Sequence, residues 1–183
     1  MALRDILLGM LARPASGYDL KRQFNQSLRH FWAAELAQIY PTLQRLERDG
    51  LLEVSVEPSP QGPERKVYRR RKPGSKQVRQ WLAQGPEFRR DRISYLAQVY
   101  FLHELDDRSD QREFLVELRD RIAEQLGELR DVERHWREND PRYPDELPDE
   151  DFFPQLTLQL GLERLAASLH WCEQSIVRLD RRS

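Results

Sequence analysis

The sequence predicts a mainly α-helical protein with a small β-hairpin, divided into residues 1–85 and residues 86–183. Three helical apolar patterns and one strand pair occupy the first part, and long heptad-like patterns fill the second. The charge divides at the same place. Residues 1–85 hold 15 Lys and Arg against 8 Asp and Glu, whereas residues 86–183 hold 15 against 23. This asymmetry favours a first part that meets a polyanion, although uneven surface charge is an alternative.

Two helices are expected before residue 32. The first buries one apolar stripe: Leu3, Ile6, Leu7, Met10 and Leu11. The second begins at Ser16, a good N-cap residue, and carries the stripe Leu20, Phe24 and Leu28. The aromatic pair Phe31 and Trp32 is expected in the core.

A third helix is expected to start at Ala37 or Gln38 and to end at Gly50, which suits a left-handed C-cap. Pro41 then falls in the first helical turn, where the N–H that proline lacks would have no partner. The apolar residues assigned to its buried face are Leu36, Ile39, Leu43 and Leu46.

The sequence LLEVSVE changes the apolar period from 3.6 to 2 and predicts a half-buried strand, with Leu52, Val54 and Val56 on its inner face. PSPQGPER predicts a long, stiff turn, and KVYRRR a second strand. Three helices followed by a hairpin are the element order of a winged helix-turn-helix domain.

The exposed face of the third helix predicts contact with duplex DNA. No acidic residue occurs on it: Ala37, Gln38, Pro41, Gln44, Arg45 and Arg48. Glutamine can bind base edges, and arginine can bind guanine or phosphate. An ordinary solvated face is the alternative. Tyr40 and Thr42 lie in the first turn, and Tyr40 either contacts DNA or packs on the second helix.

The second strand of the hairpin carries a dense run of cations: Arg65, Lys66, Arg69, Arg70, Arg71 and Lys72. Such a wing normally lies along the DNA backbone or in the minor groove. The alternative is that these cations protect a strand edge from aggregation.

Residues 86–183 predict an antiparallel helical domain. The first helix carries the stripe Ile93, Leu96, Ala97, Tyr100 and Phe101. Coiled-coil seams follow, at Leu115, Leu118, Ile122, Gln125, Leu129, Val132 and Trp136, and at Leu158, Leu162, Leu165, Leu169, Cys172, Ile176 and Leu179. A Pro- and Asp-rich loop separates them. Because a helix pair leaves apolar surface uncovered, we expect a homodimer, formed through Leu158, Leu162, Leu165, Leu169 and Ile176.

The motifs GYD, IYPTLQRLERDGL and RKVY, at these spacings, resemble the PadR family of bacterial transcriptional regulators, and residues 86–183 are similar to the long helical domain of its virulence-activator-like subfamily. The resemblance implies a winged helix-turn-helix domain, a C-terminal antiparallel helical dimerisation domain, and a homodimer on a palindromic operator. The candidate DNA-binding residues are Tyr18, Lys21, Gln38, Tyr40, Thr42, Gln44, Arg45, Arg65 and Lys66. RRRKPG departs from the family by lacking its threonine cap before the glycine.

The sequence leaves three alternatives to this function. An enzyme is disfavoured because the four histidines lack metal-ligand spacing and no phosphate loop or nucleophile motif occurs, so we expect no catalytic residue, metal or cofactor. An effector-responsive regulator could hold a small aromatic ligand beside Trp136 and Trp171, although such aromatics are more often core. A purely protein-binding module would leave the basic first part unexplained.

The address expected from the sequence is the cytoplasm. The N-terminal apolar stretch contains an aspartate, unlike a secretory signal, and no apolar run approaches the ~18 residues of a membrane span. Cys172 is the sole cysteine, so the chain cannot form an internal disulfide.

Overall fold

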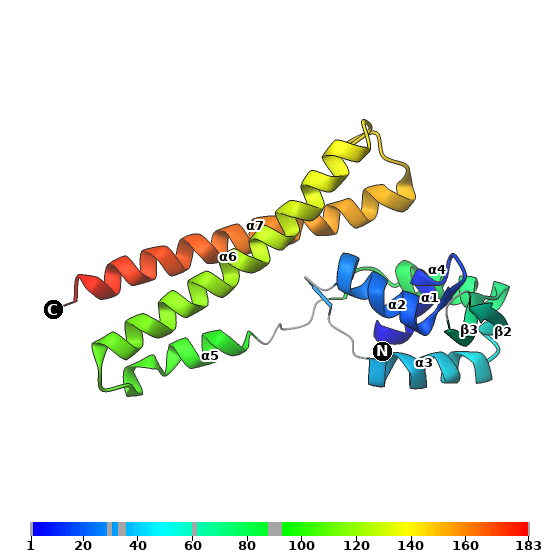
Figure 1. Ribbon diagram of the computed structural model, residues 1–183, viewed down its shortest axis with the longest axis horizontal. Coiled ribbons are helices and arrows are strands. Elements are labelled where there is room, and N and C mark those ends of the chain that lie inside the picture. Colours follow the sequence, from blue (N-terminus) through cyan, green and yellow to red (C-terminus); the bar gives the residue numbers. More distant parts are fainter. Residues whose placement is uncertain (1, 29–30, 33–35, 60–61, 88–92, 183) are drawn as a thin grey trace. The chain divides into compact units, whose positions relative to one another are not determined.

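The computed structural model describes residues 2–28, 31–32, 36–59, 62–87 and 93–182. The chain divides into two units, Met1–Arg89 and Arg90–Ser183. The first unit contains helices and a small sheet, and the second contains helices (Figure 1). The mainly helical class predicted from the sequence is confirmed.

The first unit follows the predicted order with one addition. Its elements are α1 (Ala2–Met10), β1 (Ala15–Ser16), α2 (Gly17–Gln23), the π-helical turn η1 (Phe24–Leu28), α3 (Leu36–Arg48), β2 (Leu52–Ser59), β3 (Gly62–Arg70) and α4 (Lys72–Ala83). The strands form an antiparallel sheet in the order β1-β3-β2. The expected hairpin is therefore part of a three-stranded sheet, because the short segment before α2 pairs with Val67 and Tyr68.

The apolar stripes of α1, α2 and α3 meet in one core with the inner residues of the sheet. Its buried residues are Leu7, Leu8, Leu11, Leu20, Phe24, Ile39, Leu43, Leu46, Leu51, Leu52 and Tyr68. Two residues assigned to the core are exposed instead, Leu36 and Phe31. Leu36 is the first residue of α3, one turn before Ile39, at which the buried stripe of the helix begins.

The start of α2 is held by a reciprocal capping box between Ser16 and Asp19. The Ser16 hydroxyl accepts from the Asp19 N–H at 3.1 Å, and Asp19 Oδ2 accepts from the Ser16 hydroxyl at 2.7 Å and from the Ser16 N–H at 3.1 Å. These bonds satisfy N-terminal groups that lack a helical partner. The hydrogen bond from the Ser16 hydroxyl also lowers the pKa of Asp19.

Helix α3 begins at Leu36, which is earlier than predicted, and Pro41 therefore lies in its second turn rather than its first. The Thr42 hydroxyl donates to the Gln38 carbonyl at 2.7 Å beside the proline. The predicted end is confirmed, because Gly50 has φ of 71° and Leu51 N–H donates to the Leu46 carbonyl.

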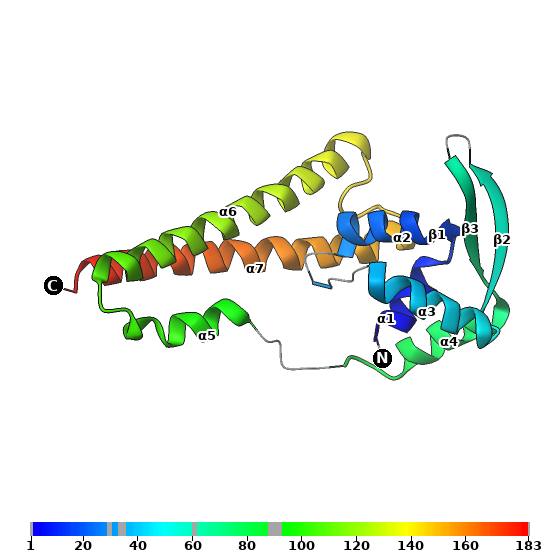
Figure 2. The ribbon, with the colours of Figure 1, turned by 60° about the horizontal axis from the view of Figure 1, so that its bottom comes forward.

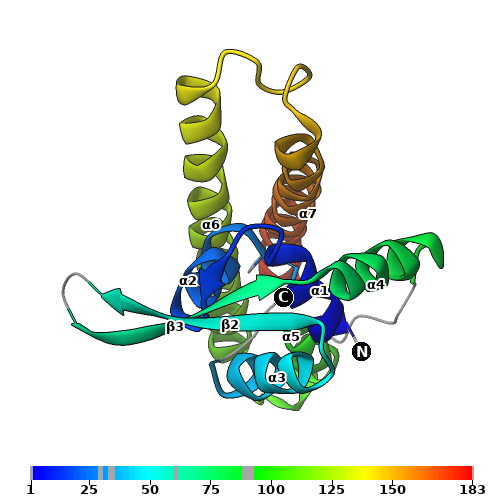
Figure 3. The ribbon, with the colours of Figure 1, turned by 90° about the vertical axis from the view of Figure 1, so that its right-hand side faces the viewer.

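The β2–β3 hairpin is longer than the sequence suggested, and its turn is shorter. Strand β2 runs through Pro58 to Ser59 and β3 begins at Gly62, with a register irregularity between Glu57 and Ser59. The prolines therefore lie mostly in the strands, and residues 60–61 of the turn lie outside the described residues. Of the predicted inner residues only Leu52 is buried, whereas Val56 is exposed because this end of the hairpin extends past the core (Figures 2 and 3).

The second unit consists of α5 (Ser94–Tyr100), the 3₁₀ turn η2 (Leu102–Glu104), α6 (Arg108–Asn139) and α7 (Asp149–Asp180). Helices α6 and α7 are antiparallel, as predicted, and an ion pair of 2.9 Å joins Arg112 near the start of one to Asp180 at the end of the other. Helix α7 begins inside the predicted loop, since Asp149, Glu150 and Asp151 favour the positive end of the helix dipole.

The second core differs from the predicted seams at two places. Helix α6 buries Leu126 and exposes Gln125, because a helix of 3.6 residues per turn drifts from a strict heptad and can bury leucine instead of glutamine. On α5 the predicted stripe is wrong. Tyr95 and Val99 pack on Leu118, Ile122 and Cys172, whereas Leu96, Tyr100 and Phe101 are exposed.

Among the helices of the described residues, none has the length and apolar character that a membrane crossing requires.

We predict that Asp19→Asn lowers the free energy of unfolding at pH 7 by about 1 kcal/mol, the usual contribution of a helix cap. Because the folded pKa of Asp19 is lowered, its contribution is complete above the unfolded value, near 3.8, and disappears as the pH falls through the folded pKa. Urea unfolding measures the difference in free energy of unfolding between the unmodified chain and Asp19→Asn, which should be smaller below pH 3.8 than at pH 7. The control is Glu64→Gln, which removes another exposed carboxylate of the unit, and a cost independent of pH would contradict the prediction.

Candidate nucleic-acid interface

The exposed face of α3 is continuous and free of carboxylates along its centre. Every residue assigned to it from the sequence is exposed: Ala37, Gln38, Pro41, Gln44, Arg45 and Arg48. Glu47 is exposed at the flank of this face, next to the sheet. Thr42 is less accessible on this face than the sequence predicted. It is half-buried, and its hydroxyl donates to the Gln38 carbonyl.

Tyr40 lies against the first residue of α2. A Cβ atom at position 17 would lie 2.8 Å from Tyr40 Cζ and closer still to Cε1, so only glycine fits beneath the ring. The Tyr40 side chain is nevertheless 42% exposed. The sequence left open whether Tyr40 packs on the second helix or contacts DNA. In the structure one side of the ring packs on α2, while the rest remains accessible.

Two further candidates belong to α2. Tyr18 is 67% exposed, and Lys21 is half-buried. The capping box sets where α2 begins, so Tyr18, its second residue, stands beside the contact between Gly17 and Tyr40.

The cations of the wing are not equivalent. Arg65 lies 3.7 Å from Asp19 and 3.7 Å from Glu57, and Arg69 lies 3.4 Å from Glu53, its cross-strand partner. These carboxylates oppose a large part of the charge that the sequence places on β3.

Arg70 serves the fold rather than the surface. Its Nη1 donates to the Leu8 carbonyl at 2.9 Å, near the end of α1, and desolvation lowers the pKa of its guanidinium. The exposed wing cations for which no ion pair is recorded among the described residues are Lys66, Arg71 and Lys72. Arg71 and Lys72 stand at the start of α4, where Arg71 occupies the N-cap position without a side-chain cap.

The sequence does not predict the ion pair between Asp19 and Arg65, whose charged atoms lie 3.7 Å apart. It joins α2 to the wing, and Asp19 makes it with the same oxygen that accepts from Ser16. The sequence signal was available in the GYD motif, since an aspartate three residues after Ser16 indicates a capping box, but its reach to the wing depends on the fold.

The residues assigned to dimerisation lie partly inside one chain. Leu158 and Ile176 are buried against α6, whereas Leu162, Leu165 and Leu169 are half-buried. A second apolar stripe on α7 is exposed: Phe153, Leu156, Leu160, Trp171 and Val177.

The structure does not bring Trp136 and Trp171 together within one chain. The ion pair between Arg112 and Asp180 sets the antiparallel register, in which Trp136 stands level with the residues near 156. Trp171 is about 20 Å further along α7 at 1.5 Å per residue. A pocket lined by both would need a second chain.

Within the described ranges, no group of three or more His, Cys, Asp or Glu side chains is arranged to hold a metal ion.

Comparisons with known proteins cover both units. Residues 6–80 match the transcriptional regulator PadR-like family, and residues 92–180 match the virulence activator alpha C-terminal family. The negative transcriptional regulator PadR of Bacillus subtilis (strain 168) is 26% identical over an alignment of 184 positions, which covers 98% of each chain.

Solved structures share the fold along the whole chain. The structure of Bacillus subtilis PadR in complex with operator DNA has a TM-score of 0.82 and 24% identity, covering 98% of this chain and 99% of that one. The structure of the same protein in complex with p-coumaric acid has a TM-score of 0.76 and 24% identity, covering 98% and 95%. The predicted architecture, a winged helix-turn-helix followed by a C-terminal helical region, is confirmed.

We predict that Gly17→Ala destabilises the first unit by about 1–3 kcal/mol, because the new methyl group overlaps the Tyr40 ring. In a Tyr40→Ala background the same change should be neutral or slightly stabilising, since alanine favours a helix over glycine. Urea unfolding of both single variants and the double variant gives the coupling.

Gly9→Ala is the matched control, because a Cβ atom at that helical position meets nothing within 4 Å. It should be neutral or stabilising. Additive costs in the Gly17 and Tyr40 double variant would show that the ring does not determine the need for glycine.

Proposed function

We propose that this chain, which belongs to the PadR-like family of transcriptional regulators and carries a virulence activator alpha C-terminal region, acts as a homodimer that binds a palindromic operator. In this proposal α3 enters the major groove and the wing lies along the adjacent backbone. The observation that carries it is the exposed face of α3, which presents glutamine and arginine without a carboxylate along its centre.

The relatives support the DNA partner. Bacillus subtilis PadR is described as a negative transcriptional regulator, and its structure with operator DNA has the fold of this chain. In our proposal Gln38, Gln44 and Arg45 contact base edges, while Tyr18, Lys21 and Arg48 hold the backbone. Tyr40 contacts the backbone through the part of its ring that Gly17 leaves exposed.

The wing contributes positive charge at the backbone. Lys66 and the pair Arg71 and Lys72 are better placed for phosphate than Arg65, because Asp19 and Glu57 already oppose the charge of Arg65. Arg65 instead holds the wing against α2, which fixes the angle at which the wing approaches DNA.

The second unit supports a dimer through its exposed apolar surface. The stripe from Phe153 to Val177 faces away from the buried seam of α7, so a second copy can cover it without opening the pair of α6 and α7. Leu165 and Leu169, which the sequence assigned to the dimer contact, pack instead against the core of the helix pair within one chain. A two-fold dimer presents two α3 helices in opposite directions, which is the symmetry of a palindromic site.

An effector-responsive regulator is the second candidate function. It is favoured by the structural neighbour in complex with p-coumaric acid, a planar aromatic acid. In this candidate a small aromatic ligand changes the affinity for the operator, with Trp136 of one chain and Trp171 of the other as one location for it.

We predict that Lys66→Ala weakens binding to all duplexes about equally and reduces the dependence of log K on log salt by about one charge. Arg65→Ala should change this salt dependence less, because two carboxylates lie 3.7 Å from its guanidinium. Gln44→Ala should instead alter the preference among sequences. Fluorescence anisotropy, with duplexes from the region upstream of the gene, measures all three.

Arg134→Ala, which removes an exposed arginine of α6 paired with Asp131, is the control and should leave DNA binding unchanged. If the unmodified chain binds no duplex even at low salt, the proposed function is wrong. Equal salt dependence for Lys66→Ala and Arg65→Ala would contradict only the division between these two cations.

We predict that Leu160→Asp converts the dimer to a monomer without unfolding the chain, because Leu160 is 56% exposed within one chain and its charge would be buried by the second copy. Sedimentation velocity measures the assembly and circular dichroism the helix content. Gln159→Asp is the control, since it adds the same charge one residue away on the polar face of α7. A Leu160→Asp chain that still dimerises would place the interface elsewhere.

A further inference from the structure

Residues 65–86, which form most of β3 and all of α4, contain no Asp or Glu. Eight Lys and Arg occur in this segment, and the proposed function uses Lys66, Arg71 and Lys72 of them for phosphate. Two later cations, Lys76 and Arg79, lie within α4. Together with Lys72 they are spaced four and three residues apart, which places the three on one face of the helix, called here the basic face of α4.

The basic face of α4 differs from an ordinary solvated helix surface. Lys72, Lys76 and Arg79 are all exposed, and none of them makes an ion pair with a residue that the structure describes. On α6, by contrast, three arginines each pair with a carboxylate about one turn away: Arg121 with Glu117, Arg134 with Asp131, and Arg137 with Glu133. Surfaces that meet only water commonly mix charges of both signs in this way. The basic face of α4 does not.

Arg79 also lies close to another cation. Burial lowers the pKa of the Arg70 guanidinium, and the nearby positive charge of Arg79 lowers it further. Like charges that are held close together oppose folding unless an anion compensates them. A polyanion that covers the basic face of α4 therefore removes a repulsion that the folded chain otherwise retains.

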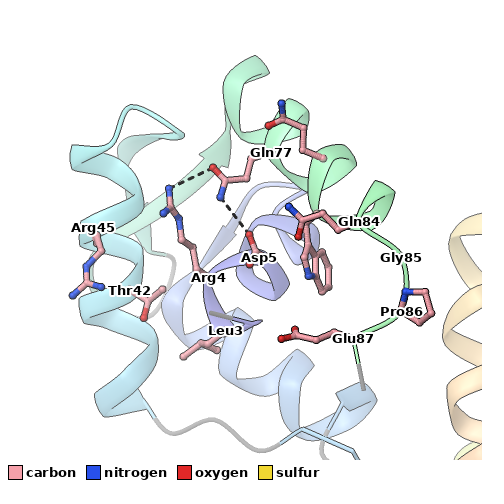
Figure 4. A pocket seen from close by; sticks show the side chains of 12 residues that line it. Leu3, Arg4, Asp5, Thr42, Arg45, Gln77, Gln84, Gly85, Pro86 and Glu87 are labelled. Carbon is pink, nitrogen blue, oxygen red and sulfur yellow. Dashed lines mark hydrogen bonds between the residues drawn. The ribbon is translucent and has the colours of Figure 1, made fainter. Parts of the chain in front are cut away.

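Contacts on the other side of α4 fix the direction in which the basic face points. A Cβ atom at Gly74 would lie 2.7 Å from the Leu51 carbonyl oxygen, so the first turn of α4 is in close contact with the end of α3 and the start of β2. Further along, Gln77 donates to the Asp5 carboxylate and accepts from Arg4, both at 3.4 Å, beside a cleft of about 900 Å³ between α1, α3 and α4 (Figure 4). The basic face therefore points away from the core of the unit.

The basic face of α4 continues the positive charge of the wing across the first unit. Strand β3 leads directly into α4, with Arg71 between them. The β2–β3 hairpin and the C-terminal half of α4 project on opposite sides of α3 (Figures 2 and 3). Cations therefore lie on both sides of α3, those of the wing on one side and those of α4 on the other.

We propose that Lys72, Lys76 and Arg79 form a second phosphate-binding surface, which holds the backbone of duplex DNA on the side of α3 opposite to the wing. This proposal rests on the proposed function, because it takes the duplex to lie across α3. A row of cations one helical turn apart can meet successive phosphates of one strand, and lysine and arginine bind phosphate without reading the base sequence. The surface raises the affinity for all duplexes and leaves the choice among sequences to α3.

The test compares the unmodified full chain with the double variant Lys76→Gln with Arg79→Gln, by fluorescence anisotropy on duplexes from the region upstream of the gene. Because each chain loses two cations, we expect at least about tenfold weaker binding at low salt, and a dependence of log K on log salt reduced by about two to four charges. The preference among sequences should not change. Lys76→Arg with Arg79→Lys, which keeps both charges, should bind like the unmodified chain.

Arg178→Gln with Arg181→Gln is the matched control. It removes two exposed cations with the same spacing from the end of α7, so it changes the net charge equally without touching α4. It should leave both the affinity and its salt dependence unchanged.

A tethered cleavage reagent locates the duplex on the protein. Cys172 is fully buried, so an iron chelate that reacts with thiols attaches at the introduced cysteine of Arg79→Cys or Lys66→Cys. Cleavage from position 79 should fall on a stretch of backbone separate from the one cut from position 66. Absence of cleavage from position 79, with cleavage from position 66, contradicts the second surface.

The remaining outcomes separate this proposal from the proposed function. If the unmodified chain binds duplex DNA and the Gln double variant of α4 binds it with the same affinity and salt dependence, the second surface is wrong and the proposed function stands. If the unmodified chain binds no duplex, both are wrong. Urea unfolding should show the Gln double variant to be at least as stable as the unmodified chain, because the repulsion of Arg70 is relieved. A loss of stability without a loss of DNA binding would show that these cations pair with carboxylates of the protein instead.

Discussion

The contact between the Tyr40 ring and the backbone of Gly17 sets the distance at which α3 crosses the start of α2. No side chain separates the two helices there, so α3 approaches as closely as a ring on a peptide plane allows. The capping box of Ser16 and Asp19 fixes the first turn of α2, and the buried stripe of α3 packs into the core on the other side. These restraints together set the orientation of the exposed face of α3, because they hold the helix both at its contact with α2 and at its buried side.

The same region connects the helices to the sheet. Asp19 accepts from Ser16 and also lies close to Arg65, so one carboxylate links the start of α2 to the wing. Arg70 makes the second connection by donating to the carbonyl of Leu8 in α1. Cations that look alike in the sequence therefore make different contacts, and a part of the positive charge of β3 lies close to carboxylates. A dense basic run is a poor measure of DNA affinity when its members face carboxylates of the neighbouring strand.

In the second unit it is the apolar residues that differ in role, because some are buried within the chain and others are exposed. One apolar stripe of α7 is buried against α6, and another is exposed on the opposite face of the helix. In helix α5, Tyr95 and Val99 similarly pack against the core, whereas Tyr100 is 75% exposed at the surface. Apolar periodicity identified these helices correctly. It did not identify which of two apolar faces would be buried within the chain, because both faces satisfy the same spacing.

The sequence by itself determined the order of the elements, the helical and extended periods, the cap at Ser16, the left-handed end of α3 at Gly50 and the division of charge, since each depends on residues close together along the chain. Tertiary structure alone decided what depends on distant residues. It paired the segment before α2 with β3, placed Gly17 under Tyr40 and brought Asp19 and Glu57 to within 3.7 Å of Arg65. It also separated Trp136 from Trp171 and brought α1, α3 and α4 together around one polar cleft. The physical reason is that local propensity acts over a few residues, whereas packing and charge pairing are settled only when segments far apart in the chain meet.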